Sequence, residues 1–428
     1  MIQPLSPDVR RLVIVVRADP VICGHSGEAR NLAEAALSRG FTDVRILTWP
    51  LDAITELPLK PIDSVKPYSA GITVERPDPV GDYKIPDGRY CAGLVGRLVE
   101  LFTDGVPTAA LSLYLAPHAN VVAEAMAVAR AMKGDVPVTT YAEAVGSDIT
   151  NVVRSCVEDG RLGAAAHAFV TYLGNDVCVA VSAYTKELIV AAAEEVDERL
   201  GSTFAEQCRR RVEISYPAIN TADFTETTDA EVAAAVDRRG LVRDEYVLFL
   251  ARITPAKGVD DLLDGFAASE ARHHVRLVIA GNGKEREAMR IRAADLGLGG
   301  QVDFFDDVGD EEKNALMAGA AAYVLPSKPR PEFTETFGIS IVEKMLAGGG
   351  PVITTETGGI PEAVGDTATI VRPDCPSDVA AALDEVVLEI GADEREARED
   401  KARTYAMQFD RQQVFDRLFG RGLFAEAV

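Results

Sequence analysis

The sequence predicts an α/β protein built from two Rossmann-like, doubly wound halves. Short runs of β-branched and other apolar residues recur along the chain, and segments with helical periodicity separate them. This alternation stops near residues 217–245 and then starts again. The 428 residues are enough for two or three domains of ordinary size. We therefore expect two parallel sheets, each covered by helices on both faces.

The first half opens with a βαβ unit. Residues 12–16 form a continuous apolar run, which is typical of a strand buried on both faces. A Gly-containing turn at 23–27 follows, then a predicted helix at 28–39 with an apolar stripe, and a predicted strand at 44–48. Strand, helix and strand at this spacing predict a parallel pair.

Residues 52–90 interrupt this pattern, because they are rich in Pro and Gly and contain only fragments of strand. We interpret this segment as an elaborated loop or small hairpin that shapes a substrate pocket. The alternation then resumes. The helices expected in the rest of the first half are 91–103, 119–133, 160–173 and 183–197, and the strands are 109–113, 137–140, 177–181 and 212–215.

The second half begins with the apolar run at 246–250. Its expected helices are 258–268, 284–296, 310–318 and 337–347, and its expected strands are 275–280, 301–305, 321–325, 351–354 and 368–371. The last helices, 377–391 and 409–424, carry enough apolar residues to pack against the body. We expect domains at 1–220 and 221–408, with 409–428 packing back on the first. In open α/β sheets ligands bind beyond the carboxyl ends of the strands, so a cleft between the halves is the expected site.

The composition excludes several classes of partner. The formal net charge of −23 disfavours binding to nucleic acids and to anionic membranes. No run of 18 apolar residues occurs, and the amino terminus has no apolar segment typical of a signal peptide. The six cysteines form no CxxC pair, so we expect free thiols in a reducing compartment. These features predict a cytoplasmic protein.

The most informative segment is 331–353, where Gly338 opens an apolar helix directly after the predicted strand and loop at 321–327. A helix amino terminus presents unpaired N–H groups and a positive dipole end, which suits a diphosphate. Glu335 precedes this helix and Glu343 lies eight residues further on. At 100° per residue the two side chains are separated by about 80° around the axis, so both can border one ligand.

These two glutamates, with Phe337 and Gly338 between them and a small-residue turn before residues 351–353, resemble the E-x7-E motif of retaining glycosyltransferase family 4. That family has the GT-B fold, in which two Rossmann-like domains face a central cleft. Residues 249–258 resemble its G-R-x-x-x-x-K-G phosphate motif, with Ala251 where Gly is usual. Further stretches that resemble the family are 176–182, 217–224, 279–283 and 357–362.

The resemblance implies roles for residues of the second half. Arg252 and Lys257 would hold the diphosphate and neutralise charge on the leaving group. Glu343 would accept hydrogen bonds from the ribose hydroxyls, and Glu335 would contact hydroxyls of the donor sugar. The remaining residues expected to bind the donor are Gly281, Phe337, Gly338 and Ile339.

The resemblance is looser in the first half. There His118 resembles the histidine that faces the donor sugar. Gly24 and Gly27 resemble the first Gly-rich loop, whose backbone approaches the phosphate and the acceptor, so the resemblance implies that both glycines bind the donor. Consecutive glycines and a second histidine near residues 140–143 are usual in the family, and this chain has neither. The residues expected on the acceptor side are His25, Ser26, Tyr141 and Glu143.

The implied reaction transfers a hexose-type sugar from a UDP- or GDP-sugar with retention of configuration, without a metal or a bound cofactor. The two domains would close over both substrates and exclude water. The leaving phosphate would take the proton of the acceptor. We expect a soluble acceptor, which is a sugar, a cyclitol, a small thiol or a natural-product scaffold. A homodimer is left open.

Other interpretations of the same residues remain open. Residues 306–310 spell DDxxD, which binds magnesium in all-helical prenyl-diphosphate enzymes, but here it follows a strand and Asp310 is expected to cap a helix. Residues 281–283 lack the third glycine of a dinucleotide site. A GT-B nucleotide-sugar epimerase or phosphorylase, and a non-catalytic nucleotide-sugar sensor, are the alternative functions.

Overall fold

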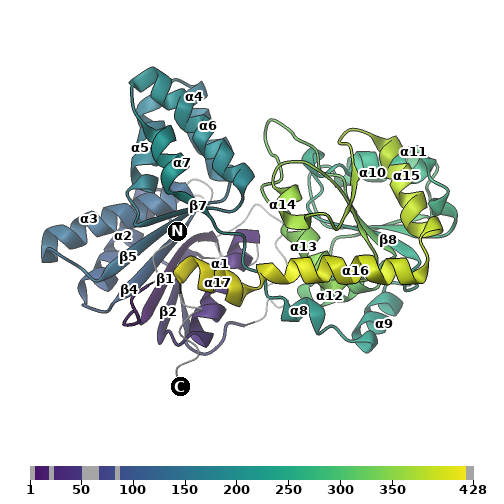
Figure 1. Cartoon of the computed structure of the whole chain (residues 1–428), viewed down its shortest axis with the longest axis horizontal. Coiled ribbons are helices and arrows are strands. Elements are labelled where there is room, and N and C mark those ends of the chain that lie inside the picture. The colour runs from purple at the N-terminus through teal and green to yellow at the C-terminus, as the bar shows by residue number, and fades with distance from the viewer. Residues whose placement is uncertain (1–4, 19–23, 51–66, 82–86, 421–428) are drawn as a thin grey trace. The chain divides into compact units, whose positions relative to one another are not determined.

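The computed structural model describes residues 5–18, 24–50, 67–81 and 87–420. The chain divides into two compact units, one formed by Met1–Ile219 with Arg411–Val428 and the other by Asn220–Asp410. Each unit is a parallel sheet flanked by helices (Figure 1). The prediction of two doubly wound α/β halves is therefore confirmed.

The described strands of the first unit form one parallel sheet in the order β3-β2-β1-β4-β5-β6-β7. The strands are β1 (Arg11–Ala18), β2 (Asp43–Trp49), β3 (Ile72–Glu75), β4 (Thr108–Leu113), β5 (Val138–Ala144), β6 (Val177–Ala180) and β7 (Val212–Ile214). The helices are α1 (Gly24–Ser38), α2 (Gly88–Thr103), α3 (Asn120–Lys133), α4 (Arg154–Glu158), α5 (Leu162–Leu173), α6 (Ala183–Leu200), α7 (Phe204–Arg211) and α17 (Arg411–Phe419). Two π-helical turns are added at Leu115–Ala119 and Ile149–Val153.

The alternation of side chains along β1 explains why this sheet is covered on both faces. Leu12 and Ile14 pack into one core with residues of α1 and α17, whereas Val13 packs into a second core with residues of α2 and α3. The carboxyl-terminal helix contributes Phe415 to the first of these cores, next to Phe41 at a ring-centroid distance of 5.7 Å. The prediction that this helix packs back on the first half is confirmed.

Two predictions for the first unit are corrected, and one helix was missed. The Gly-containing turn is wrong from Gly24 onward, because α1 already begins there. No hairpin occurs in the described residues of 52–90: β3 pairs in parallel with β2, and residues 51–66 and 82–86 lie outside the described ranges. Helix α7 was not predicted, because three consecutive arginines fill its last turn and it buries only Ala205 and Cys208.

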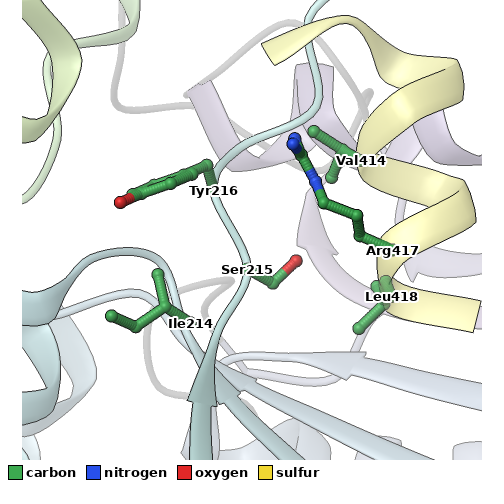
Figure 2. Close-up of a pocket in the computed structure, with 6 residues that line it drawn as sticks. All are labelled: Ile214, Ser215, Tyr216, Val414, Arg417 and Leu418. Atoms are coloured by element: carbon green, nitrogen blue, oxygen red, sulfur yellow. The ribbon is translucent and has the colours of Figure 1, made fainter. Parts of the chain in front are cut away.

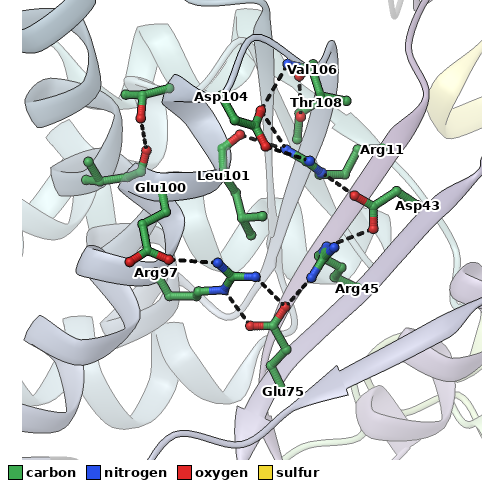
Figure 3. A network of polar contacts seen from close by, with 12 residues as sticks. Arg11, Asp43, Arg45, Glu75, Arg97, Glu100, Leu101, Asp104, Val106 and Thr108 are labelled. Atoms are coloured by element: carbon green, nitrogen blue, oxygen red, sulfur yellow. Dashed lines mark hydrogen bonds and ion pairs between the residues drawn. The ribbon is translucent and has the colours of Figure 1, made fainter.

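An ion-pair network runs from the start of β1 across β2, β3 and α2 (Figure 3). Its members, called the Arg11–Glu75 network below, are Arg11, Asp43, Arg45, Glu75, Arg97, Glu100 and Asp104. Arg11 is 4% exposed, and its guanidinium reaches Asp43 at 2.6 Å and Asp104 at 2.8 Å. Two arginines hold Glu75, with Arg45 at 2.7 Å and Arg97 at 2.6 Å, and both lower its pKa against the opposing effect of burial.

The first unit also contains a cavity of about 140 Å³ between the segment after β7 and α17 (Figure 2). Figure 2 shows Ser215 pointing toward α17, while the side chain of Arg417 extends from α17 toward the segment around Tyr216. None of the residues that line this described cavity is among those that the sequence predicts for the site.

The described strands of the second unit form a parallel sheet in the order β10-β9-β8-β11-β12-β13. The strands are β8 (Tyr246–Leu250), β9 (Arg276–Ala280), β10 (Val302–Phe305), β11 (Ala322–Leu325), β12 (Val352–Thr355) and β13 (Thr369–Val371). The helices are α8 (Ala222–Thr225), α9 (Asp229–Arg238), α10 (Val259–Ala268), α11 (Arg286–Asp295), α12 (Asp310–Ala318), α13 (Ile339–Ala347), α14 (Ile360–Val364), α15 (Pro376–Asp384) and α16 (Ala392–Ala406). Four short turns are added at Pro255–Lys257, Ala271–His273, Glu385–Glu389 and Met407–Phe409.

Helices α10 and α15 pack against each other, and α13 lies between α12 and α16. The segment at 217–245, predicted as a connection, instead contains α8 and α9, and α9 begins with a capping box formed by Thr228 and Glu231. Among the described residues, no helix combines the length and the apolarity that crossing a bilayer requires.

Candidate active site

The topology of the second sheet defines where a ligand can bind. Successive strands from β8 lie on one side, through β9 to β10, and successive strands from β11 lie on the other, through β12 to β13. The chain therefore changes direction between β8 and β11. The crevice at such a switch point, beyond the carboxyl ends of the strands, is where open α/β sheets bind ligands.

The loops after β8 and β9 are in direct backbone contact. A Cβ atom on Gly281 would lie 2.0 Å from the carbonyl oxygen of Ala251, and one on Gly283 would lie 2.0 Å from that of Ile253. The backbone N–H of Ile253 also donates to the carbonyl of Asn282 at 2.9 Å. The two glycines are thus required by this close approach, which holds the loop containing Arg252 against its neighbour.

Close backbone contacts of glycines also hold the loop after β11 and the start of α13. Gly338 precedes α13 with φ of +105°, and this helix has no side-chain N-cap, so its first N–H groups lack a capping acceptor. Gly358 and Gly359, after β12, approach the carbonyl oxygens of Glu335 and Thr336 so closely that a Cβ atom would lie 2.0 Å away. These contacts fix the segment that carries Glu335 beside the helix start.

Tyr323 forms hydrogen bonds on both sides of the switch point. Its hydroxyl donates to the carbonyl of Leu250 at 2.9 Å, at the end of β8, and lies 3.1 Å from the hydroxyl of Ser340 in the first turn of α13. The loop that holds Arg252 and the uncapped amino end of α13 are therefore connected through one buried side chain.

The basic residues predicted to hold a diphosphate differ in their surroundings. Arg252 is exposed, and among the described residues it has no hydrogen-bond or ion-pair partner. Lys257 is 7% exposed, pairs with Glu335 and lies 5.2 Å from the centre of the Phe333 ring. The structure thus brings Lys257 and Glu335 together, and it leaves the Arg252 guanidinium available to an anion.

Glu343, in the second turn of α13, has a partner that the sequence analysis did not identify. Lys313 of α12 donates to its Oε1 at 2.8 Å, and the ammonium lies 5.2 Å from the centre of the Phe224 ring. Burial lowers the pKa of Lys313, but Glu343 and Asp310 raise it more, so the pKa lies above its ordinary value. No spacing rule could have found this pair, because the partners are 30 residues apart.

The other residues predicted to bind the donor contribute backbone rather than side chains. Phe337 is 2% exposed and packs on Phe409 with ring centroids 5.0 Å apart, so its side chain belongs to the core. Ile339 is half-buried in the first turn of α13. Their N–H groups lie at the positive end of the helix dipole.

The DDxxD stretch is engaged by arginines. Asp306 pairs with Arg286 at 2.6 Å, and Asp307 pairs with Arg239 at 2.8 Å, which lowers its pKa. The expected cap is corrected: Gly309 precedes α12, and Asp310 is the first helical residue. Across the described ranges, no group of three or more His, Cys, Asp or Glu side chains is arranged to hold a metal ion.

The first sheet has its own switch point between β1 and β4, and His118 lies in the π-helical turn that follows β4. His118 is 3% exposed, and its Nδ1 has no hydrogen-bond partner in the described part of the chain. Burial lowers the pKa of His118 to about 3, and Arg17 contributes to the same shift. The imidazole is therefore neutral at physiological pH.

The backbone beside this histidine is strained. Tyr114 adopts φ of +91° with ψ of 137°, a region that residues with a side chain rarely occupy. Its N–H donates to the carbonyl of Glu143 at 3.1 Å, and the Arg17 guanidinium lies 4.7 Å from the centre of its ring. Strain of about 1–3 kcal/mol persists only where surrounding contacts impose it, and it is concentrated at functional sites.

Glu143, at the end of β5, is fully buried, and neither of its carboxyl oxygens has a well-formed hydrogen bond among the described residues. Burial raises its pKa well above the ordinary value, and the neighbouring carboxyl groups of Glu28 and Asp148 raise it further. Glu28, on α1, accepts the N–H of Ala218 at 3.2 Å. Burial thus disfavours the charged form of Glu143, and a second carboxyl group faces it.

The remaining residues predicted in the first half, with Gly24 and Gly27 expected to bind the donor and the others on the acceptor side, lie in or beneath α1. Gly27 has open space around the position of a Cβ atom, so packing does not require glycine there. Gly24 is exposed at the start of α1, and the side chain of His25 lies outside the described residues. Ser26 is 1% exposed, and Tyr141 is fully buried beside Phe419, so neither presents surface to a ligand in this structure.

The comparisons with known proteins place these residues in a family context. Residues 237–405 match the family described as glycosyl transferases group 1. A D-inositol 3-phosphate glycosyltransferase of Streptomyces avermitilis is 32% identical over 200 residues, which are 44% of this chain and 41% of that protein. A GDP-mannose-dependent alpha-(1-6)-phosphatidylinositol monomannoside mannosyltransferase of Mycolicibacterium smegmatis is 30% identical over 239 residues, which are 54% of this chain and 56% of that protein.

The chain therefore spans about half the length of these relatives. Among solved structures, Anabaena Alr3699/HepE in complex with UDP and glucose has a TM-score of 0.68 at 17% sequence identity. The superposition covers 96% of this chain and 98% of the Anabaena chain. The family match includes every residue of the second-unit site, from Arg252 to Glu343, and leaves His118 and Glu143 outside.

Proposed function

Because residues 237–405 match the group 1 glycosyltransferases and the chain has the GT-B fold, we propose that it is a retaining transferase of that group. It would move a hexose-type sugar from a UDP- or GDP-sugar to a small acceptor. The donor would bind to the second unit, with its diphosphate between Arg252, Lys257 and the amino end of α13.

One observation supports this proposal most strongly. At the carboxyl edge of the second sheet, the loops after β8 and β9 contact each other through Gly281 and Gly283, and the loops after β11 and β12 do so through Gly358 and Gly359. They carry the Arg252 guanidinium, which is exposed and has no partner within the described ranges. The Tyr323 hydroxyl links the loop that holds it to the start of α13, which has no side-chain cap. An anion is the ligand that such a combination favours, and a diphosphate supplies two anionic groups.

In the proposed reaction, Arg252 and the N–H groups of α13 stabilise the charge that develops on the departing diphosphate. Lys257 would exchange part of its contact with Glu335 for a phosphate oxygen, which would free Glu335 for hydroxyls of the sugar. The acceptor attacks the face that the diphosphate leaves, through an oxocarbenium-like transition state, and a phosphate oxygen takes its proton. Under this proposal no side chain acts as a general base.

The first unit would supply the other side of the reaction. His118 is neutral, and its Nδ1 has no hydrogen-bond partner in the described part of the chain, so this atom is suited to accept a hydrogen bond from a sugar hydroxyl. Gly27, which packing does not require, would let the acceptor approach the backbone of α1. The relatives named for inositol derivatives support a cyclitol or sugar acceptor over a thiol or a natural-product scaffold.

Calorimetric titration with UDP and GDP tests the donor site. We expect Arg252→Ala to weaken binding at least about tenfold, since charge-assisted hydrogen bonds contribute roughly 1.5–3 kcal/mol. Arg276→Ala is the matched control, because this arginine lies at the amino end of β9 and pairs with Asp303. Equal affinity of the wild type and Arg252→Ala would remove Arg252 from the site.

Product analysis tests the chemistry. With a donor of α configuration, NMR should show an α-linked product, and turnover should persist in EDTA. A β-linked product would overturn retention, and loss of activity in EDTA would require a metal. Incubation with the donor alone separates the alternatives, because an epimerase would change the sugar nucleotide without an acceptor.

A further inference from the structure

Lys313 is a buried cation that the proposed chemistry does not yet use. It projects from α12 toward α13, its side chain is 15% exposed, and its ammonium pairs with Glu343 at 2.8 Å. Asp310 on its own helix and Asp223 on α8 are the other carboxylates that act on it. The Phe224 ring, at 5.2 Å, covers the ammonium.

Contacts of the neighbouring Asn314 and of Glu343 restrict the position of this lysine. The neighbouring Asn314 donates to the carbonyl of Asp223 at 2.6 Å and so anchors α12 to α8. Lys313 itself occupies only Oε1 of Glu343. The other oxygen, Oε2, is not buried and has no hydrogen-bond partner in the described ranges, so one acceptor atom remains available to a ligand.

This arrangement restricts what Glu343 can recognise. A carboxylate oxygen accepts hydrogen bonds, and the pairing of Oε1 with Lys313 leaves Oε2 as the acceptor that a ligand can reach. The ion pair also limits the orientations of the side chain, so Oε2 keeps one direction. A site with a fixed acceptor binds a ligand that has a hydroxyl at that point, and it rejects an analogue without the hydroxyl because the acceptor then loses its partner.

We propose that Lys313 is a positioning residue that fixes Glu343 as an acceptor for the ribose hydroxyls, and that the pair selects ribonucleotide over 2′-deoxyribonucleotide donors. This inference rests on the proposed function, because it assumes that a nucleoside diphosphate binds beside Glu343. It adds a residue that determines the choice of donor. This residue lies on α12, whereas the E-x7-E motif belongs to the segment that leads into α13.

The test is the ratio of the dissociation constants of UDP and 2′-deoxy-UDP, with GDP and 2′-deoxy-GDP as a second pair. We expect the wild type to prefer the ribonucleotide by about 10-fold or more, in keeping with a hydrogen bond to a charged group. In Lys313→Met, binding of the ribonucleotide should weaken and the ratio should fall to within about threefold. Lys313→Arg, which keeps the cation, should retain most of the preference.

Further variants separate this role from a general structural one. Lys401→Met is the matched control, because Lys401 is 55% exposed and pairs with Asp366, and it should leave the ratio unchanged. Glu343→Gln should reduce the ratio as Lys313→Met does, and the double variant should add little. If Lys313→Met does not fold, Lys313→Gln and Glu343→Gln carry the test, and a wild-type ratio in both would overturn the inference.

The possible failures are distinguishable. If the wild type binds neither UDP nor GDP, the proposed function falls and the inference falls with it. If the wild type binds UDP and 2′-deoxy-UDP equally, the donor site stands and the role of Lys313 is refuted. A wild-type ratio in a folded Lys313→Met variant would also refute it.

Discussion

The Arg11–Glu75 network and the carboxyl-edge cluster around His118 and Glu143 belong to the same sheet but use buried polar groups in opposite ways. In the network, the acids at the start of β2, at the end of β3 and after α2 each contact a guanidinium at 2.6–2.8 Å (Figure 3). In the cluster, Glu143 faces the carboxyl groups of Glu28 and Asp148, and Nδ1 of His118 has no hydrogen-bond partner within the described residues.

The difference indicates what each region is for. Unpartnered buried polar atoms cost roughly 1–3 kcal/mol each, so a fold retains them where they have a use beyond stability. The cluster lies next to the switch point of the sheet and next to the strained Tyr114. We therefore expect the network to determine the stability of the first unit and the cluster to determine its activity.

The largest effect is expected from breaking the network. Arg11→Met would leave Asp104 without its arginine and the carbonyl of Leu101 without a donor, so the free energy of unfolding should fall by about 3 kcal/mol. Trp49, the single tryptophan, lies at the end of β2, so urea unfolding followed by its fluorescence reports on this unit. The turnover of folded molecules should not change.

A matched control uses an exposed ion pair of the same unit. Arg154 and Glu158 are 56% and 59% exposed, and Arg154→Met should change the unfolding free energy by less than about 0.5 kcal/mol. Equal effects of Arg11→Met and Arg154→Met would contradict the structural role of the network.

The next effect should appear in activity alone. His118→Ala is expected to lower kcat/KM for the donor by about 100-fold, which is about 2.7 kcal/mol, while the Trp49 unfolding midpoint moves much less than in Arg11→Met. His167, which is exposed on α5, is the control, and His167→Ala should behave as the wild type. A fully active His118→Ala would remove this histidine from the mechanism.

A smaller effect, with a defined dependence on pH, is expected at Glu143. Because burial raises its pKa in the folded protein above the unfolded value of 4.5, the folded state binds more protons above pH 4.5. Stability is therefore lost as the pH rises from 4.5 toward the raised pKa. Glu143→Gln removes this loss and should be about 2 kcal/mol more stable than the wild type at pH 8, by Trp49 fluorescence, with the gain vanishing near pH 4.

The smallest effect is expected at the exposed end of the network. Glu100 is 68% exposed and contacts Arg97 at 2.7 Å, while Glu75 also holds that arginine. Glu100→Gln should change the unfolding free energy by less than about 0.5 kcal/mol, as measured by the same urea titration. A loss comparable to that of Arg11→Met would show that the network acts as one unit rather than through its buried arginine.

The fold was predictable because its strands are buried on both faces. The runs at 12–16 and 246–250 contain almost only apolar residues, and each is a central strand of its sheet. Helix α16 escaped prediction for the converse reason. It is charged on all sides, buries only Ala402 and Ala406, and is held by pairs such as Arg395 with Glu399 at 3.2 Å.

The site was predictable only where backbone geometry dictates residue type. Gly281, Gly338 and the acids around them form a linear pattern, because close approaches and a helix start recur at fixed positions along the chain. The partners of these residues come from other helices. Lys313 meets Glu343, and Glu28 meets Glu143, through packing, which leaves no trace in sequence spacing.

The chain crosses from one unit to the other twice, and in each unit the residues at the two crossings are hydrogen-bonded to each other. The N–H of Arg411 donates to the carbonyl of Ile219 at 2.8 Å, and the hydroxyl of Thr221 donates to Asp410 at 2.7 Å. The segment from 220 to 410 is thus an insert whose ends start and finish together. Exchange of this segment for that of a relative would therefore need only two junctions, and the three core clusters of the first unit contain no residue of it.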